Sequence, residues 1–279
     1  MPFGALKAGV EAVLTRMPQS VRGRRLAVLC YHSAHPSAEF PTRTAPEMLE
    51  RQMRWLREHC RVVRFADVWD EARRPGSSQP TVAVTFDDGH ADNHTTALPI
   101  LLRYEIPATF FVATGLIDRD PEVIAARSWR GWRETDSTLT WEQVLDMRDH
   151  GMDIGSHGHT HTALARLPDA AAFSDLARSK QSREERLGER VVAMAYPKGR
   201  PRRDVLPASV HVARGVGFEH GATVLLRGVK RSDEPMMIPR FPIAADGLDL
   251  FRAKVMGRLD LIGTLQERAP LSLLRTLGP

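Results

Sequence analysis

The sequence predicts an α/β fold in which parallel strands form a barrel with helices outside it. From Leu26 onward, short apolar runs rich in β-forming residues alternate with longer segments of helical periodicity, and this alternation is typical of a parallel sheet covered by helices. About six to eight repeats of the unit fit a barrel better than a small open sheet. The chain has 279 residues, of which 42% are hydrophobic and 26% are charged. It therefore has enough apolar material for the core of one such domain.

The predicted elements follow one another in a regular order. Strands are predicted, as short apolar runs, at 26–31, 62–65, 81–86, 108–113, 152–155, 191–195, 222–226 and 238–243. Helices are predicted, from apolar residues at helical spacing, at 46–60, 66–74, 93–104, 141–150, 169–188 and 203–214. Residues 74–80 contain Pro, Gly and Ser and predict a surface loop. Residues 116–140 have no clean periodicity, which predicts a long loop of the kind that often carries function.

Charge and cysteine content exclude several classes of protein. The formal net charge of +5 permits anionic partners without requiring them. We expect no nucleic-acid partner, because the chain has no recognisable reading motif and no dense Lys/Arg stripe with interleaved aromatics. Cys30 and Cys60 are too few for a disulfide scaffold, and we expect both to be reduced. No apolar run approaches the roughly 18 residues that a membrane-spanning helix needs.

Residues 1–25 are expected to form an amphipathic N-terminal helix or extension ahead of a main domain at 26–279. A signal peptide needs an uninterrupted apolar centre, which this segment lacks. The charged residues that interrupt it are Lys7, Glu11 and Arg16. We therefore expect a cytoplasmic protein. The apolar face of the segment lies beside a basic cluster, so it either docks on its own domain or contacts a membrane surface.

Two adjacent carboxylates, Asp87 and Asp88, follow the predicted strand 81–86 directly. In parallel α/β folds, active sites lie at the carboxyl ends of the strands. On their own, these residues and Gly89 are equally consistent with a turn or with the cap of the next helix. A second polar cluster favours the functional interpretation.

Three histidines, His157, His159 and His161, follow another predicted strand within five residues. His157 and His161 are four residues apart, so both can face one point from a helical turn or a tight loop. Together with one carboxylate they would form a two-histidine, one-carboxylate site for a catalytic divalent metal. Zinc, cobalt, nickel or ferrous iron would suit such a site. The alternative is a solvated histidine-rich loop.

In their order and spacing, three stretches resemble the first three motifs of the polysaccharide deacetylases, the carbohydrate esterases that share the nodulation-type chitooligosaccharide deacetylase domain. The stretches are Thr85-Phe-Asp-Asp-Gly89, Ser156-His-Gly-His-Thr-His161 and Ala195-Tyr-Pro-Lys-Gly199. Further segments also look like those of the family, and they are Leu29-Cys-Tyr-His32, Ala97-Leu-Pro-Ile-Leu101, Ile106-Pro-Ala-Thr-Phe-Phe-Val112, Leu139-Thr-Trp-Glu-Gln143 and Pro239-Arg-Phe-Pro242. The resemblance covers roughly residues 26–245.

The resemblance implies a distorted (β/α) barrel, closed or incomplete, of about seven parallel strands. It also implies one divalent metal ion, with zinc the first choice, bound by Asp88, His157 and His161. Asp87 would be the general base that accepts a proton from water, a role that suits a carboxylate beside a metal ion. His159 lies between the two matched histidines and is not expected to be a ligand.

The third motif is expected to form a wall of the substrate groove, through Tyr196, Pro197 and Lys198. A backbone N–H near Tyr196 would help the metal to hold the oxyanion of the tetrahedral intermediate. Lys198 stands where the family often has an aromatic residue, and it either meets an anionic group of the substrate or is solvated. Trp129 and Trp132 are candidates for stacking on a sugar ring.

The chain departs from the family pattern at two positions. Many relatives carry an arginine that orients the base, but that position is Ala195 here. Arg240 either supplies the same guanidinium from a later strand or is a surface residue. Relatives also supply the general acid from a late histidine, whereas no histidine follows His220. His32, at the end of the first predicted strand, is the candidate for the general acid in place of that histidine. The alternative is that His32 packs in the core or supports the metal site.

The sequence thus predicts a metal-dependent hydrolase that removes an N-acetyl group from an amino sugar and releases acetate. The substrate would be a saccharide, a glycan precursor or a sugar conjugate. O-acetyl esters and N-formyl groups are chemically close alternatives, and a non-catalytic, metal-containing sugar-binding relative is a third. No obligate protein partner is inferred from the sequence.

Overall fold

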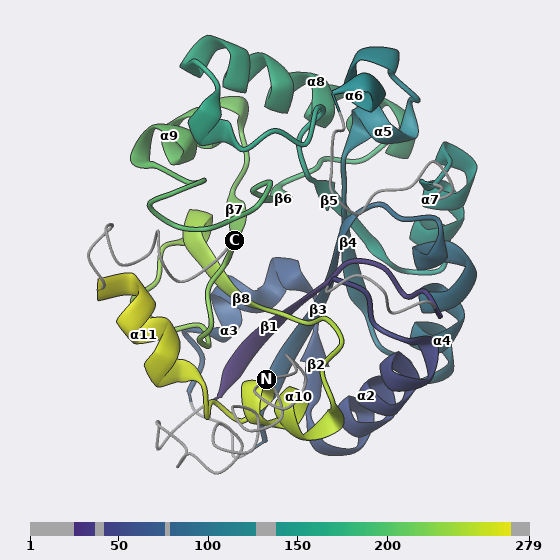
Figure 1. The fold of residues 1–279 in the computed structure, drawn as a ribbon, viewed down its shortest axis with the longest axis vertical. Coiled ribbons are helices and arrows are strands. Elements are labelled where there is room, and N and C mark those ends of the chain that lie inside the picture. Colours follow the sequence, from purple (N-terminus) through teal and green to yellow (C-terminus); the bar gives the residue numbers. More distant parts are fainter. Residues whose placement is uncertain (1–24, 37–41, 76–78, 127–137, 269–279) are drawn as a thin grey trace, which may run out of the picture.

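The computed structural model describes residues 25–36, 42–75, 79–126 and 138–268. Within them, parallel strands form a ring (Figure 1). In order around the ring they are β1 (Leu26–Tyr31), β3 (Thr81–Asp88), β4 (Ala108–Val112), β5 (Asp153–Ser156), β6 (Ala193–Ala195), β7 (His220–Val224) and β8 (Ile238–Pro242). β1 pairs with β3 on one side and β8 on the other, which closes the ring. The predicted α/β barrel of about seven parallel strands is confirmed.

The strand β2 (Arg61–Val63) adds to the first residues of β3, on the edge that β4 uses further along. Helices surround the ring (Figure 1). Their bounds are α2 (Pro46–His59), α3 (Val68–Glu71), α4 (Leu98–Arg103), α5 (Thr114–Ile117), α6 (Pro121–Ala125), α7 (Trp141–Asp149), α8 (Asp169–Leu187), α9 (Pro207–Val216), α10 (Leu248–Val255) and α11 (Asp260–Arg268). None of the helices in the described parts of the chain combines the length and apolar composition that crossing a bilayer requires.

The structure differs from the predicted elements in two places. The region 116–140 was expected to be a loop, but α5 and α6 lie at its start. The first turn of α6 is stabilised locally, because the Asp120 side chain accepts hydrogen bonds from two of its N–H groups and Pro121 is its first residue. The helices α10 and α11 were not predicted. The predicted N-terminal helix, apart from Arg25, lies outside the described residues, so its contacts stay a prediction.

The inside of the barrel is filled by alternate residues of its strands. Because successive side chains of a strand point to opposite faces, one face of β1 carries Leu26 and Val28. These residues join inward-facing residues of other strands in one buried apolar cluster: Ala83, Phe111, Ala193, Ala195, Ala222 and Ile238. The last inward positions at the carboxyl ends of β1, β3 and β8 are Cys30, Asp87 and Arg240, and Thr85 precedes Asp87 on the same face of β3. The interior of the barrel is therefore apolar over most of its length, and it becomes polar at the carboxyl ends of the strands, where the candidate site lies.

Small residues leave room for large ones inside the barrel. Gly155 faces the ring of Phe111, and a Cβ at Gly155 would lie only 2.4 Å from Phe111 Cδ1. The Phe111 ring in turn lies under the Arg240 guanidinium, whose carbon is 5.4 Å from the ring centroid. At this distance the ring face attracts the cation. The glycine before the histidine motif thus positions an aromatic ring that supports a buried arginine.

Candidate active site

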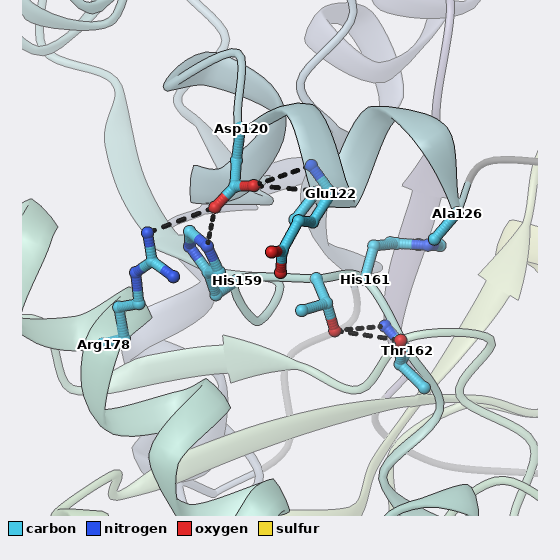
Figure 2. A pocket seen from close by; sticks show the side chains of 9 residues that line it. Asp120, Glu122, Ala126, His159, His161, Thr162 and Arg178 are labelled. Carbon is cyan, nitrogen blue, oxygen red and sulfur yellow. Dashed lines mark hydrogen bonds and ion pairs between the residues drawn. The ribbon is translucent and has the colours of Figure 1, made fainter.

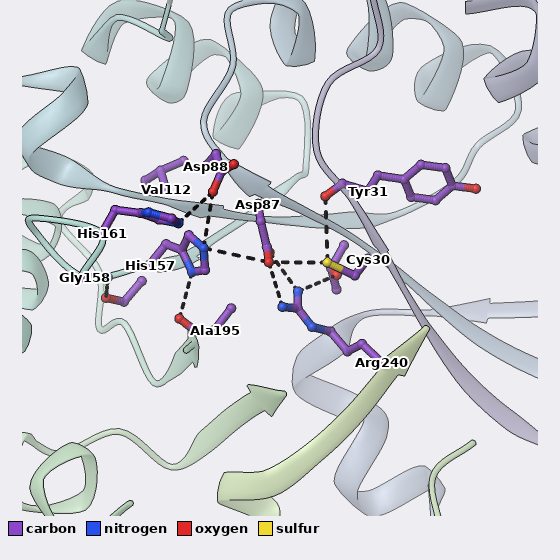
Figure 3. Close-up of polar contacts among 12 residues, drawn as sticks. Cys30, Tyr31, Asp87, Asp88, Val112, His157, Gly158, His161, Ala195 and Arg240 are labelled. Carbon is purple, nitrogen blue, oxygen red and sulfur yellow. Dashed lines mark hydrogen bonds and ion pairs between the residues drawn. The ribbon is translucent and has the colours of Figure 1, made fainter. Parts of the chain in front are cut away.

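The two carboxylates at the end of β3 face different partners. Asp87 continues the strand and points into the barrel. Asp88 has a φ of 74° and Gly89 a φ of 80°, and the left-handed region is uncommon for a residue with a side chain. Asp88 is therefore directed toward His157 and His161, while Asp87 contacts Arg240 (Figure 3). The turn that the sequence allowed at this position is present, and it separates the two carboxylates.

The histidines that face Asp88 are held by backbone contacts. The Nδ1 atom of His157 lies 2.8 Å from the carbonyl oxygen of Ala195, a bond that requires a hydrogen on Nδ1 and leaves the lone pair on Nε2. His157 Nε2 lies 3.4 Å from Asp88 Oδ1. His161 Nε2 lies 3.0 Å from the same oxygen. Two imidazole nitrogens thus converge on one carboxylate oxygen.

The group Asp88, His157 and His161 fits a divalent metal ion. All three residues are buried, and their ligand atoms lie within 4.8 Å of one another. Within the described part of the chain, Asp88 Oδ1 accepts no hydrogen bond although it is buried. A buried carboxylate oxygen without a donor, facing two imidazole nitrogens, is a suitable cation site.

The charge states of these residues also suit a metal. Burial opposes the charge on Asp88, but His161 and the other imidazoles around it hold its pKa well below the usual range. Burial lowers the pKa of His161 to about 4. Near neutral pH the site therefore combines an ionised carboxylate with a neutral imidazole, the forms in which these groups bind metal ions.

Arg240 lies inside the barrel and pairs with Asp87 rather than lying at the surface. Its Nη1 is 2.7 Å from Asp87 Oδ1 and its Nη2 is 2.7 Å from Oδ2, with no exposed surface on Arg240. Nη1 also donates to Thr85 Oγ1. Burial works against the charge on Asp87, but the Arg240 guanidinium outweighs it and lowers the pKa of Asp87 to about 2. Asp87 is therefore ionised and fixed in orientation.

His32 lies near Asp87, just after β1. One of its ring nitrogens is within 4.8 Å of Asp87 and Cys30 ligand atoms. Its Nδ1 atom is buried and has no hydrogen-bond partner within the described residues. Burial lowers the pKa of His32. The structure brings His32 to the site, and its role as an acid or as a supporting group stays a prediction.

The third motif does not present every expected group. The Tyr196 side chain is in the core with 1% exposure, and its backbone N–H donates to the carbonyl oxygen of Ala222 at 3.1 Å in the ladder between β6 and β7. This N–H already has an acceptor, and the expectation that a backbone N–H near Tyr196 holds the oxyanion stays a prediction. Pro197 is buried, and Lys198 is exposed, although burial of part of its side chain lowers its pKa.

A cavity of about 360 Å³ opens beside His161 (Figure 2). Its walls come from α6, α8 and the segment after β5. They are formed by Asp120, Glu122, Val123, Ala126, His159, Thr160, His161, Thr162 and Arg178. The cavity thus joins a residue of the candidate metal site to both polar and apolar side chains. Trp129 and Trp132 lie outside the described residues, so their stacking on a sugar stays a prediction.

His159 faces this cavity and not Asp88. Its ring contacts Thr114 Oγ1 through Nδ1 at 2.9 Å and Asp120 Oδ2 through Nε2 at 3.2 Å. Asp120 also caps α6, with Oδ1 accepting from the N–H groups of Glu122 and Val123. One carboxylate therefore connects the histidine motif to the helix that walls the cavity.

Replacing Asp120 with Ala is expected to destabilise the protein by about 1–2 kcal/mol, because it removes a helix cap and the partner of a buried imidazole. Asp120→Asn retains the capping oxygen and should cost less than half as much. Urea unfolding of both variants measures the difference. Asp249→Ala is the matched control, since Asp249 lies in the first turn of α10 without capping it. Equal losses for Asp120→Ala and Asp120→Asn would contradict the capping role.

The sequence missed two features of this site. Cys30 is a buried free thiol, and its Sγ lies 3.3 Å from Asp87 Oδ2, a contact that was not predicted. The sequence did carry a signal for this contact, because Cys30 continues the inward-facing series Leu26 and Val28 on β1. Asp92 directly precedes the helical segment that starts at Asn93 but does not cap it, since its carboxylate accepts from Ser33 Oγ and the Ala34 N–H. It thereby fixes the segment after β1, a contact that no local pattern shows.

Comparison with known proteins agrees with the family resemblance. The family model for polysaccharide deacetylase matches residues 74–218. YxkH of Bacillus subtilis is 28% identical over 203 residues, which is 71% of this chain and 64% of that protein, slightly less than two thirds of its length. Poly-β-1,6-N-acetyl-D-glucosamine N-deacetylase of Staphylococcus aureus strain MRSA252 is 25% identical over 202 residues, covering 72% of this chain and 67% of that protein.

Solved structures share the fold. Streptococcus pyogenes deacetylase PplD, in complex with acetate, superposes with a TM-score of 0.71 at 20% identity, covering 84% of this chain and 99% of that chain. IcaB from Ammonifex degensii superposes with a TM-score of 0.65 at 26% identity, covering 85% and 98%. Because the match to the family model spans more than half of the 279 residues, this chain belongs to the polysaccharide deacetylase family.

Proposed function

We propose that this protein is a metal-dependent deacetylase that hydrolyses the N-acetyl group of an amino sugar. The observation that carries the proposal is the arrangement of two adjacent carboxylates. Asp88 lies with His157 and His161 in a buried group that fits a metal ion, and Asp87 lies beside it, held by Arg240 through two hydrogen bonds. Family membership supports the same reaction class.

The reaction adds water to the acetyl carbon and breaks the carbon–nitrogen bond, giving acetate and a free amine. A divalent ion bound by Asp88, His157 and His161 would polarise the acetyl carbonyl and lower the pKa of water. Asp87 would accept the proton of the attacking water. Arg240 would keep Asp87 ionised and in one orientation, the role that other members assign to an arginine at the position of Ala195.

The leaving nitrogen needs a proton, and we assign this step to His32. Its ring lies close to Asp87. Within the described residues, His32 Nδ1 neither donates nor accepts a hydrogen bond. Because burial lowers its pKa, the His32 ring is neutral near neutral pH, and it would pass the proton that Asp87 takes from water on to the leaving nitrogen. This assignment replaces the late histidine that the sequence lacks after His220.

The cavity beside His161 is the proposed place of the sugar. Its walls combine carboxylates, a guanidinium and hydroxyls with the apolar side chains of Val123 and Ala126, a mixture that suits a ring with polar edges and apolar faces. Poly-β-1,6-N-acetylglucosamine is the first substrate to test, since the Staphylococcus aureus relative is named for it. N-formyl and O-acetyl sugars are the chemical alternatives.

Acetate release from N-acetylglucosamine oligosaccharides tests the proposal. With metal-loaded protein, Asp87→Asn should lower kcat by about 10²–10⁴-fold, the usual contribution of a general base. Asp149→Asn is the control, because Asp149 is 63% exposed at the end of α7. Full activity of Asp87→Asn would contradict the assigned base.

A non-catalytic sugar-binding protein is the second candidate, and the missing late histidine favours it. In that case metal-loaded protein would bind the oligosaccharides without releasing acetate. Binding measured by calorimetry, run beside the acetate assay, separates the two functions. Release of acetate that depends on Asp87 would exclude the second candidate.

A further inference from the structure

Cys30 occupies an unusual place for a buried thiol. It is the last inward-facing residue of β1 and has no exposed surface. Its Sγ atom lies 3.3 Å from Asp87 Oδ2 and 4.0 Å from the carbonyl oxygen of Tyr31 (Figure 3). The carboxylate oxygen is both nearer and charged, so it is the stronger acceptor for the thiol hydrogen.

The thiol has a hydrogen to donate. Burial raises the pKa of Cys30 well above its ordinary value, and the negative charge of Asp87 adds to this effect. The thiol is therefore protonated at neutral pH, and the S–H group next to a carboxylate acts as a donor.

The contact completes a set of donors around Asp87. Oδ1 receives one hydrogen bond, from Arg240 Nη1 at 2.7 Å. Oδ2 receives two, from Arg240 Nη2 at 2.7 Å and from Cys30 at 3.3 Å. Arg240 approaches from β8 and Cys30 from β1, so the carboxylate is held from two strands. Oδ2 also lies 3.9 Å from His157 Nε2, so the contact with Cys30 fixes the oxygen that faces the candidate metal group.

We propose that Cys30 is a positioning residue that fixes the orientation of the Asp87 carboxylate through an S–H hydrogen bond to Oδ2. The inference rests on the proposed function, in which Asp87 is the general base. It assigns no contact between Cys30 and the substrate. Arg240 supplies the charge that pairs with Asp87, and Cys30 supplies a third, neutral contact.

A different interpretation makes Cys30, His32 and Asp87 ligands of a second metal ion, since their ligand atoms also lie within 4.8 Å of one another. The Arg240 guanidinium argues against it. It occupies both oxygens of Asp87, and its positive charge in the buried interior opposes a second cation there. The hydrogen bond is therefore the better explanation of the geometry.

Kinetics of two substitutions test the inference. Cys30→Ala removes the donor and should lower kcat for acetate release roughly tenfold, with KM unchanged, because a hydrogen bond to a charged group is lost. Cys30→Ser retains a donor and should restore kcat to within about threefold of the original protein. Cys60→Ala is the matched control, since Cys60 is also buried but directly follows α2, outside the set of donors around Asp87. Equal kcat values for Cys30→Ala and Cys30→Ser would overturn the proposal.

Infrared spectroscopy tests the hydrogen bond without activity. The S–H stretching band lost in Cys30→Ala should lie at lower wavenumber than the band lost in Cys60→Ala, and Asp87→Asn should raise it, because an amide is a weaker acceptor. Coincident bands would overturn the inference, as would loss of one bound zinc ion in Cys30→Ala. If the protein releases no acetate but the band is shifted, the proposed function fails while the contact stands.

Discussion

Asp88→Asn is expected to weaken zinc binding more than a hundredfold, the largest effect on ligand binding that the site predicts. Asp88 provides the carboxylate on which His157 and His161 converge. An amide carries no charge to balance the cation. Mutation of a residue that only supports a metal ligand typically lowers metal affinity 10–100-fold, and replacement of the ligand itself should lower it further. Calorimetric titration of metal-free protein with zinc, with the metal content of the purified protein, measures the loss.

The control for this experiment is His150→Gln. His150 follows α7, half exposed, and its nearest carboxylate is Asp146 at 3.4 Å, so the substitution should leave zinc binding unchanged. The original protein should bind one zinc ion per chain at this group. Unchanged affinity in Asp88→Asn would show that the ion binds elsewhere, and the proposed metal site would be wrong.

Arg240→Met is expected to lower the free energy of unfolding by about 3–5 kcal/mol, the cost of leaving one member of a buried ion pair without its partner. Asp87 would keep its burial and lose both of its charged donors. The double variant Asp87→Asn, Arg240→Met should recover much of the loss, since it leaves no buried charge. Urea unfolding of both variants and of the original protein measures these differences.

Arg214→Met provides the comparison for this pair. Arg214 pairs with Glu234 at the surface, where the two side chains are 52% and 43% exposed. Loss of an exposed pair should cost less than about 1 kcal/mol. A cost for Arg240→Met as small as for Arg214→Met would mean that the buried pair contributes little to stability. Failure of the double variant to recover stability would point to packing against Phe111 instead.

Much of the fold could be predicted from the sequence, because the signals are local. Apolar runs of four to eight residues fix the strands, and helical spacing of apolar residues fixes most helices. The predictions for β1 and α8 agree with the structure to within one residue at either end. The short helices α5 and α6 escaped prediction because four or five residues show no period, and their ends depend on single contacts such as the Asp120 cap.

The candidate site could be predicted in part for a physical reason. Parallel strands end at one edge of the sheet, so residues that follow β3 and β5 lie close together wherever these strands stand in the ring. The pairing of Asp88 with His157 and His161 follows from that rule and from the spacing of the histidines. The hydrogen bond from the Tyr196 N–H to Ala222 could not be predicted from that rule, because hydrogen bonds between β6 and β7 depend on the register of both strands.

By itself, the sequence determined the alternation of strands and helices and the residues that gather at the carboxyl ends of the strands, because both depend on neighbours along the chain. Only the tertiary structure decided that the barrel closes between β1 and β8, and that Arg240 and Cys30 both reach Asp87. Arg240 is 153 residues from Asp87 in the chain, and Cys30 is 57 residues away. Contacts over such separations are set by strand order and inward parity in the closed ring, and no local pattern encodes them.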